Sequence, residues 1–269
     1  MRITRTPLST HLINHPLTRS VLLIGLIVWL AACQPVSEVP SIDPEDIAAN
    51  NRGVALMGQY ENEQARQVFA ELLEQHPDWV DVEVNLAIAT LNRQQPDDEL
   101  RALEIVERIL QDHPDHLRAR YIAGLMRFYI GQSDAAMEHF SVLIEAVPDD
   151  AHVAYFTAQA LGQLGENQEA LALYERAIEL DPYLRSAYYG AALTLRQLGQ
   201  AEKAREQLAI YQRFANNPRA HLAEFRYTRK GRLAEALAIG RGAPVQSPAD
   251  PEGPLFASPE TLGALPISH

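Results

Sequence analysis

The residues that could perform acid–base, nucleophilic or metal chemistry are scattered along this chain of 269 residues and form no recognisable motif. His76 and His113 each precede a proline that we expect to end a helical unit, and His139 and His152 stand alone. The sequence contains no HExxH zinc motif, no CxxC pair, no Gly-rich phosphate loop and no serine-nucleophile motif. We therefore expect no catalytic residue, no metal site and no cofactor, and no enzyme activity.

Two groups of acidic residues, Asp97-Asp98-Glu99 and Asp149-Asp150, are further candidates for acid–base chemistry. Both groups lie where a turn meets the start of an expected helix, and carboxylates at such positions cap free backbone N–H groups. We therefore interpret them as solvated helix caps.

Cys33 is the only cysteine in the chain, so it cannot form an internal disulfide. It follows a basic start, an apolar run from Val21 to Leu30 and two alanines, which together are typical of a secretory signal. The apolar run is shorter than the roughly 20 residues that a membrane-spanning helix needs. Leu30-Ala31-Ala32-Cys33 resembles the bacterial lipobox, whose cysteine is lipidated and becomes the first residue of the mature protein.

The lipobox resemblance implies a protein anchored in the bacterial cell envelope, with Cys33 as the lipidation site. Bacterial lipoproteins carry three acyl chains, and several chains anchor a protein far more stably than one. Gln34 is not the Asp associated with retention in the inner membrane, so the resemblance favours an outer-membrane lipoprotein that faces the periplasm. An uncleaved membrane anchor or a plain secretory signal is the alternative.

The charge balance is acidic, with 23 Lys plus Arg against 35 Asp plus Glu and a formal net charge of −12. The expected signal contains three Arg and no acidic residue, so the mature chain has 20 basic and 35 acidic residues, or −15. This balance disfavours nucleic acid and anionic lipid surfaces as partners, because both require basic patches. We expect membrane contact through the lipid anchor only.

Three tyrosines that recur at intervals of 34 residues, Tyr121, Tyr155 and Tyr189, are the best candidates for binding chemistry. Other candidate contacts on or near the same helix faces are Arg118, Leu125, Phe128, Tyr129, Gln159, Leu193, Arg196 and Gln197. Tyr and Arg are favoured hot-spot residues, so this pattern predicts a row of contacts for a protein or peptide partner. The alternative is that these rings only fill the seam between neighbouring hairpins.

The elements that would position these side chains follow from one repeated unit of 34 residues. The repeat is carried by two sets of four residues, each 34 apart: Gly131, Ala136, Phe140 and Pro148, then Gly165, Ala170, Tyr174 and Pro182. The Gly ends a first helix, the Ala allows close helix approach, the aromatic ring fills the core, and the Pro ends the second helix. A fixed period of this length predicts stacked helical hairpins.

This spacing resembles the tetratricopeptide repeat (TPR), whose known signature has the same length and the same Gly, Ala, aromatic and Pro positions. The resemblance implies an all-α, right-handed superhelix whose first helices line a concave binding surface. The residues that clamp a terminal carboxylate in chaperone-binding TPR domains are not evident here. Chaperone tails are therefore not the partner that we expect.

Extending the repeat in both directions divides the chain into four parts. We expect a signal at 1–32, a lipidated tether at 33–43, a solenoid at 44–240 and a disordered Pro/Gly-rich tail at 241–269. The first helix should start at Asp43-Pro44. The solenoid would hold five to six hairpins, the last a short one that contains Gly231, Leu233 and Ala236.

Three segments also resemble the TPR region that precedes an FG-GAP propeller and ASPIC/UnbV domain in some bacterial exported proteins. They are NLAIATLNRQ (85–94), DPYLRSAYYG (181–190) and NPRAHLAEFRYTRKG (217–231), within a resemblance that covers 51–240. No Asp-rich calcium loops of the propeller family follow them. Two functional hypotheses result: a lipid-anchored scaffold that binds a partner in its groove, or the TPR portion of a split or truncated exported protein whose recognition function lies elsewhere.

The lipobox interpretation makes a direct prediction for cells that express this protein. An inhibitor of the lipoprotein signal peptidase should cause an unprocessed form of higher mass to accumulate, because cleavage before Cys33 would be blocked. Electrophoresis and detergent phase partition of the protein measure this change. An unchanged size and partition would contradict lipidation at Cys33.

Overall fold

The computed structural model describes residues 42–240, in which ten α-helices follow one another. The signal, Cys33 and the tail after Gly240 lie outside the described residues, as does the expected tether up to Ser41. The helices form five consecutive hairpins: α2 (Pro44–Gly58) with α3 (Asn62–Gln75), α4 (Val80–Arg93) with α5 (Asp98–Asp112), α6 (Leu117–Tyr129) with α7 (Ser133–Ala146), α8 (Ala151–Leu164) with α9 (Asn167–Leu180), and α10 (Arg185–Gln197) with α11 (Ala201–Arg213). The predicted all-α solenoid is confirmed.

The ends of the helices follow from local sequence chemistry. Helix α2 begins at Pro44, whose fixed φ and missing N–H suit the first position of a helix. The loops after α6, α8 and α10 each contain a glycine with positive φ, at Gly131 (+80°), Gly165 (+87°) and Gly199 (+75°). This left-handed conformation costs little only for a residue without Cβ, so these glycines fix where each first helix turns into the second.

The core of a hairpin is built by an aromatic ring that lies flat against a glycine of the other helix. A Cβ atom on Gly124 of α6 would lie 2.8 Å from Cε1 of Phe140 in α7, and one on Gly53 of α2 would lie 2.6 Å from Cε1 of Phe69 in α3. Phe69 and Phe140 are fully buried, as are the small residues Ala65 and Ala136 of α3 and α7. Close helix approach and ring packing therefore depend on the same few positions.

The prediction of a sixth helical hairpin is wrong. After the 3₁₀ turn η1 (Phe214–Asn216), the chain forms an irregular segment of turns and short extended stretches, residues 217–240, that we call the strap. Its only helical element in the described range is the 3₁₀ turn η2 (Arg232–Ala234). Gly231 has a φ of +94° directly before this turn, and the backbone beyond Glu235 pairs with side chains of the solenoid instead of with itself.

One member of each acidic group at the turns, Asp98 and Asp150, is buried, whereas Asp97 and Asp149 are exposed as expected. Asp98 is fully buried and its carboxylate lies 2.5 Å from a guanidinium nitrogen of Arg93, which also contacts Glu63 at 2.9 Å. In this turn Gln94 and Asp97 adopt left-handed conformations, with φ of +59° and +66°. Asp150 does cap α8, by accepting from the N–H groups of His152 and Val153, but it too is buried.

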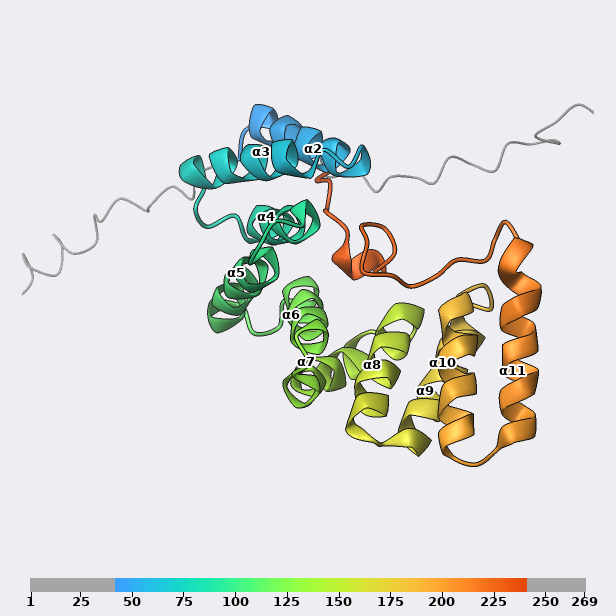
Figure 1. Cartoon of the computed structure of the whole chain (residues 1–269). Coiled ribbons are helices and arrows are strands. Elements are labelled where there is room, and N and C mark those ends of the chain that lie inside the picture. Colours follow the sequence, from blue (N-terminus) through green and yellow to red (C-terminus); the bar gives the residue numbers. More distant parts are fainter. Residues whose placement is uncertain (1–41, 241–269) are drawn as a thin grey trace, which may run out of the picture. The chain divides into compact units, whose positions relative to one another are not determined.

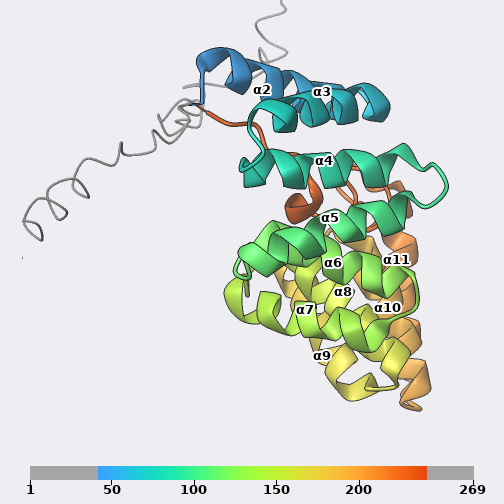
Figure 2. The ribbon, with the colours of Figure 1, turned by 90° about the vertical axis from the view of Figure 1, so that its left-hand side faces the viewer.

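The hairpins are arranged so that the first helices lie on the inner side of an arc and the strap runs along that inner side (Figure 1). Figure 2 views the ribbon from the outer side, with the strap behind α5. Among residues 42–240, no helix combines the length and apolar character that crossing a bilayer requires.

Replacing Phe140 by Ala should destabilise the solenoid by about 3–5 kcal/mol, because the ring is fully buried and its removal leaves a cavity over Gly124. Urea unfolding followed by circular dichroism measures this change. Val142→Ala on the same helix is the control, because Val142 is 41% exposed. Equal unfolding midpoints for the two variants would contradict the packing described here.

Candidate functional site

The inner surface of the solenoid is lined by the five first helices, α2, α4, α6, α8 and α10, and the strap contacts each of them. It begins beside α10 and ends beside α2, so it runs against the order of the hairpins (Figure 1). The surface therefore has two parts. The strap covers one part along α2, α4 and α6, and a pocket remains open between α8 and α10.

Two asparagines hold the end of the strap by pairing with its backbone. Asn51 of α2 donates to the carbonyl of Ile239 (2.9 Å) and accepts from its N–H (2.8 Å). Asn85 of α4 makes the same pair of bonds with Leu237, at 3.0 and 2.8 Å. Asn50 is a second donor to the Leu237 carbonyl, at 3.1 Å. These amides satisfy alternate strap residues in the way a neighbouring β-strand would.

Helix α6 contacts the middle of the strap with two further donors. Arg118 donates to the carbonyl of Glu235 at 2.7 Å, and the Tyr121 hydroxyl donates to the carbonyl of Lys230. Gly231 comes so close to α8 that a Cβ atom on it would lie 2.7 Å from Cβ of His152. Only a residue without a side chain fits this crossing, and the positive φ of Gly231 restricts it further.

The side chain of Lys230 points into the protein and is 1% exposed. Its Nζ donates to Oδ1 of Asn92 at 2.8 Å and lies 4.8 Å from the centroid of the Phe225 ring. Burial away from water penalises the ammonium form and lowers the pKa of Lys230 to about 7. No carboxylate pairs with this amine in the described residues.

The beginning of the strap is held by α10 and the loop before it. His221 exchanges backbone bonds with this loop, because its N–H donates to the Tyr183 carbonyl (3.0 Å) and its carbonyl accepts from the Arg185 N–H (2.9 Å). The N–H of Ala223 donates to Oγ of Ser186 at 3.0 Å. Apart from the bond between Asn92 and the Lys230 side chain, the hydrogen bonds from α2, α4, α6 and α10 described above reach main-chain atoms of the strap.

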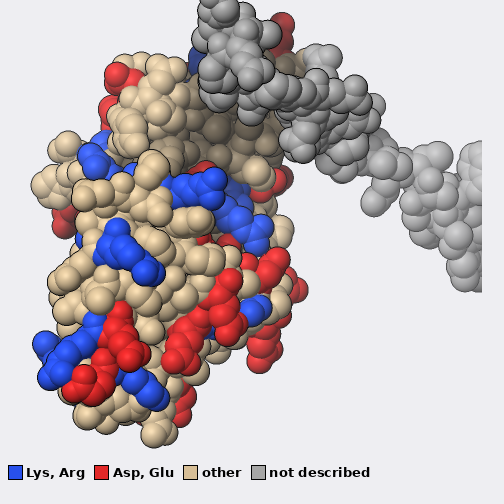
Figure 3. Space-filling model, turned by 90° about the vertical axis from the view of Figure 1, so that its right-hand side faces the viewer, with Lys and Arg blue, Asp and Glu red and all other residues tan. Residues whose placement is uncertain are grey.

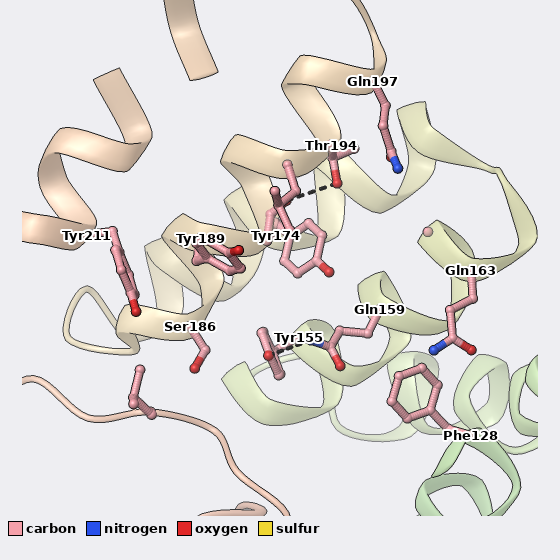
Figure 4. A pocket seen from close by; sticks show the side chains of 14 residues that line it. Phe128, Tyr155, Gln159, Gln163, Tyr174, Ser186, Tyr189, Thr194, Gln197 and Tyr211 are labelled. Carbon is pink, nitrogen blue, oxygen red and sulfur yellow. Dashed lines mark hydrogen bonds between the residues drawn. The ribbon is translucent and has the colours of Figure 1, made fainter. Parts of the chain in front are cut away.

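The open part of the surface is a pocket of about 320 Å³ between α8 and α10, with α11 on one side (Figure 4). Four tyrosines and three glutamines lie around it, and none of its lining residues is charged; the aromatic and amide residues are Phe128, Tyr155, Gln159, Gln163, Tyr174, Tyr189, Gln197 and Tyr211. Gln159 donates to the hydroxyl of Tyr155 at 2.5 Å, which orients both side chains. Burial raises the pKa of Tyr155, so its hydroxyl stays neutral and can still donate.

The three equivalent tyrosines have three different environments. Tyr121 is fully buried against Phe140 and Phe156 and contacts the strap. Tyr155 is 5% exposed at the wall of the pocket, whereas Tyr189 is 44% exposed at its rim. The three tyrosines therefore do not form one exposed row. Tyr121 fits the alternative interpretation, in which the ring fills the seam between neighbouring hairpins.

The other predicted contacts divide in the same way. Phe128, Gln159 and Leu193 line the pocket together with Tyr155 and Tyr189. Arg196 lies with Tyr189 and Leu193 at a neighbouring hollow between α10 and α11. Arg118, Leu125 and Tyr129 lie elsewhere: Arg118 faces the strap, Leu125 is fully buried, and the Tyr129 ring packs on Phe225 with centroids 3.9 Å apart. Their contact with a partner stays a prediction.

Sequence reasoning missed the asparagines that hold the strap, although a signal was present. Asn51 and Asn85 are 34 residues apart, so they occupy equivalent repeat positions. It also missed Gln163, Ser186 and Tyr211 of the pocket, which lie off the repeat positions of the three tyrosines.

Comparison with known proteins gives the family. A tetratricopeptide repeat model matches residues 100–151 and 155–219, and a second one matches residues 51–78. The chain is a tetratricopeptide repeat protein. No curated protein matches this TPR protein in sequence.

Solved structures with the same fold include MamA in several forms. MamA 41-end from Desulfovibrio magneticus RS-1 superposes with a TM-score of 0.59 at 17% identity, over 66% of this chain and 99% of that one. MamA MSR-1 gives a TM-score of 0.54 at 22% identity, over 64% and 97%. At these identities the likeness shows the fold alone. The described part of the TPR protein holds no group of three or more His, Cys, Asp or Glu placed to bind one metal ion.

The buried amine of Lys230 predicts a specific pH dependence of stability. Its pKa is about 7 in the folded protein and about 10.5 when exposed, so unfolding takes up a proton between these values. The free energy of unfolding should therefore rise by about 1 kcal/mol per pH unit from pH 7 to pH 9. Lys230→Met should remove this rise, as urea unfolding at several pH values would measure. Equal pH slopes for the two chains would show that Lys230 is not buried in this way.

Proposed function

We propose that this TPR protein is a scaffold of the bacterial cell envelope that holds a protein or peptide partner at the pocket between α8 and α10. The observation that carries the proposal is the pocket itself, an uncharged, tyrosine-rich hollow on the inner surface of a TPR solenoid. TPR folds serve as binding scaffolds, and the inner surface is extended enough to contact a partner segment over several repeats.

The pocket chemistry favours a partner segment with an apolar or aromatic side chain flanked by free backbone groups. Tyr189 and Tyr211 offer rings at the mouth, with centroids 5.3 Å apart, and rings anchor partners with little loss of conformational entropy. Gln163 and Gln197 offer amides that can both donate to and accept from a peptide backbone. A charged anchor would be desolvated here without an opposite charge, since the lining residues are uncharged.

The cell-envelope location rests on the sequence alone. The Leu-Ala-Ala-Cys sequence that ends at Cys33 supports lipid anchoring, and Gln34 supports an outer-membrane position that faces the periplasm. The described solenoid begins at Pro44, so the lipid would be attached ten to eleven residues before the first helix. Such a scaffold would serve the assembly or organisation of envelope proteins.

Tyr189→Ala should weaken capture of the partner about tenfold, because truncating an aromatic hot-spot residue costs about 1–2 kcal/mol. Crosslinking in cells followed by mass spectrometry, with the full chain as bait, measures the yield of each crosslinked protein. Tyr60→Ala is the matched control, since Tyr60 is 57% exposed in the turn after α2 and does not line the pocket.

A partner recovered equally with Tyr189→Ala and with the unchanged chain would place its contact outside the pocket. Recovery of no envelope protein under any condition would contradict the scaffold and favour the second hypothesis, in which recognition belongs to another part of a longer exported protein.

A further inference from the structure

We propose that the strap is an exchangeable internal ligand, and that the groove beneath it along α2, α4 and α6 binds an extended, basic segment of a partner protein. The pocket between α8 and α10 meets the strap only near its beginning, at Leu222, and not at the replaced segment 230–239. The partner segment would replace residues 230–239 of the strap and take over their backbone bonds.

Where the last residues of the strap lie, the groove binds backbone atoms more than side chains. Asn51 and Asn85 each bond both the N–H and the carbonyl of one strap residue, Ile239 and Leu237. The Leu237 side chain is 44% exposed, so it contributes little to the fit. A different extended segment can make the same four bonds, because every residue except proline offers one N–H and one carbonyl.

The middle of the groove selects for particular residues in the bound segment. The strap places a buried Lys at 230, hydrogen-bonded to Asn92, and directly after it a Gly that crosses His152 at van der Waals distance. A segment that replaces the strap needs a residue without Cβ at the second position, since any Cβ would overlap His152. The groove therefore favours a partner that carries a Lys-Gly pair about six residues before the part held by Asn85.

Charge complementarity indicates a basic partner. Residues 44–216 contain 14 Lys plus Arg and 28 Asp plus Glu, a net charge of −14, whereas the replaced segment 230–239 contains two and one, a net charge of +1. Within this segment Arg232 pairs with Asp150 at 2.8 Å. Figure 3 shows separate groups of Lys and Arg interspersed with groups of Asp and Glu on one face of the protein. Opposite charges of this kind steer association and select partners.

The strap is built to separate from the solenoid without unfolding it. The large buried side chains Met57, Phe69, Phe140 and Phe156 belong to the helices, so the hairpins have their own core. Of the strap, only Tyr227, Lys230, Gly231 and Ala234 are buried; five further hydrophobic residues, among them Phe225 and Ile239, pack partly buried against the core, and its helical structure is limited to one 3₁₀ turn. Segments with few buried apolar contacts open at lower free energy than the core.

Hydrogen exchange on the intact chain tests whether the strap opens separately. The amides of Leu237 and Ile239, which donate to Asn85 and Asn51, should exchange at least about 100-fold faster than the amides in the middle of α4 and α6. Exchange of these two amides at the same rate as the helix amides would mean that the strap opens only when the solenoid unfolds, which would overturn the proposal.

Peptide exchange tests the partner class. A site-specific protease sequence is placed at Asn216-Asn217 in the full chain, the chain is cut, and a fluorescent peptide with the sequence of residues 219–240 is added. The cut protein should take up the peptide, and the uncut protein should take it up at least about tenfold less well, because its own strap competes at high effective concentration. Absence of uptake by the cut protein, or loss of its helical signal on cutting, would overturn the proposal.

Variants of the protein and of the peptide test whether the peptide binds in the groove. Asn51→Ala should weaken peptide binding by about tenfold, since it removes two hydrogen bonds to Ile239. Asn167→Ala is the control, because Asn167 begins α9 and has no hydrogen bond to the strap. A peptide with Gly231→Val should bind at least tenfold more weakly than the unchanged one.

Light scattering on the uncut chain separates a partner protein from a second copy of this chain. A monomer at all concentrations supports the partner segment, whereas a dimer that the free peptide dissociates would mean that straps are exchanged between copies, which would overturn the assignment to a partner. These readouts need no envelope partner and leave Tyr189 unchanged. Failure here is therefore distinguishable from failure of the pocket proposal.

Discussion

The packing of aromatic rings onto glycines of neighbouring helices is the constraint on which the rest of this structure depends. Phe140 can lie over α6 only because Gly124 has no side chain, and Phe69 lies over Gly53 in the same way. These contacts hold the two helices of a hairpin close together. Since the hairpins then stack in a regular way, the five first helices line one continuous inner surface on which both the strap and the pocket are built.

That inner surface would leave polar side chains such as Asn85 facing solvent if the strap were absent. Side chains that reach the surface from equivalent positions of successive units, such as Asn51 and Asn85, are spaced so that one extended chain can pair with both. The strap therefore gains fixed conformation from hydrogen bonds rather than from a core of its own. Because the strap has no core of its own, its conformation depends on the solenoid, whereas the solenoid has its own hydrophobic core.

The two parts of the inner surface differ in chemistry as well as in occupancy. Along α2, α4 and α6 the surface presents amides, a guanidinium and a hydroxyl to a backbone, and it lies in an acidic protein opposite a basic strap. Between α8 and α10 it presents aromatic rings and amides without charge. One solenoid thus combines a site suited to an extended backbone with a site suited to an apolar anchor.

The sequence by itself determined the helical repeat, the start of the first helix at Pro44 and the turns at Gly131 and Gly165, because these depend on local spacing and on backbone conformations that few residues adopt. Only the tertiary structure decided which of the equivalent repeat positions are buried and which are exposed. Tyr121 is buried and Tyr189 exposed because their surroundings differ, and residues 217–240 form a strap because partners as far away in sequence as Asn51 bind their backbone. The 34-residue spacing marks Asn51 and Asn85 as equivalent repeat positions, but the local sequence of residues 217–240 does not show that its backbone binds them.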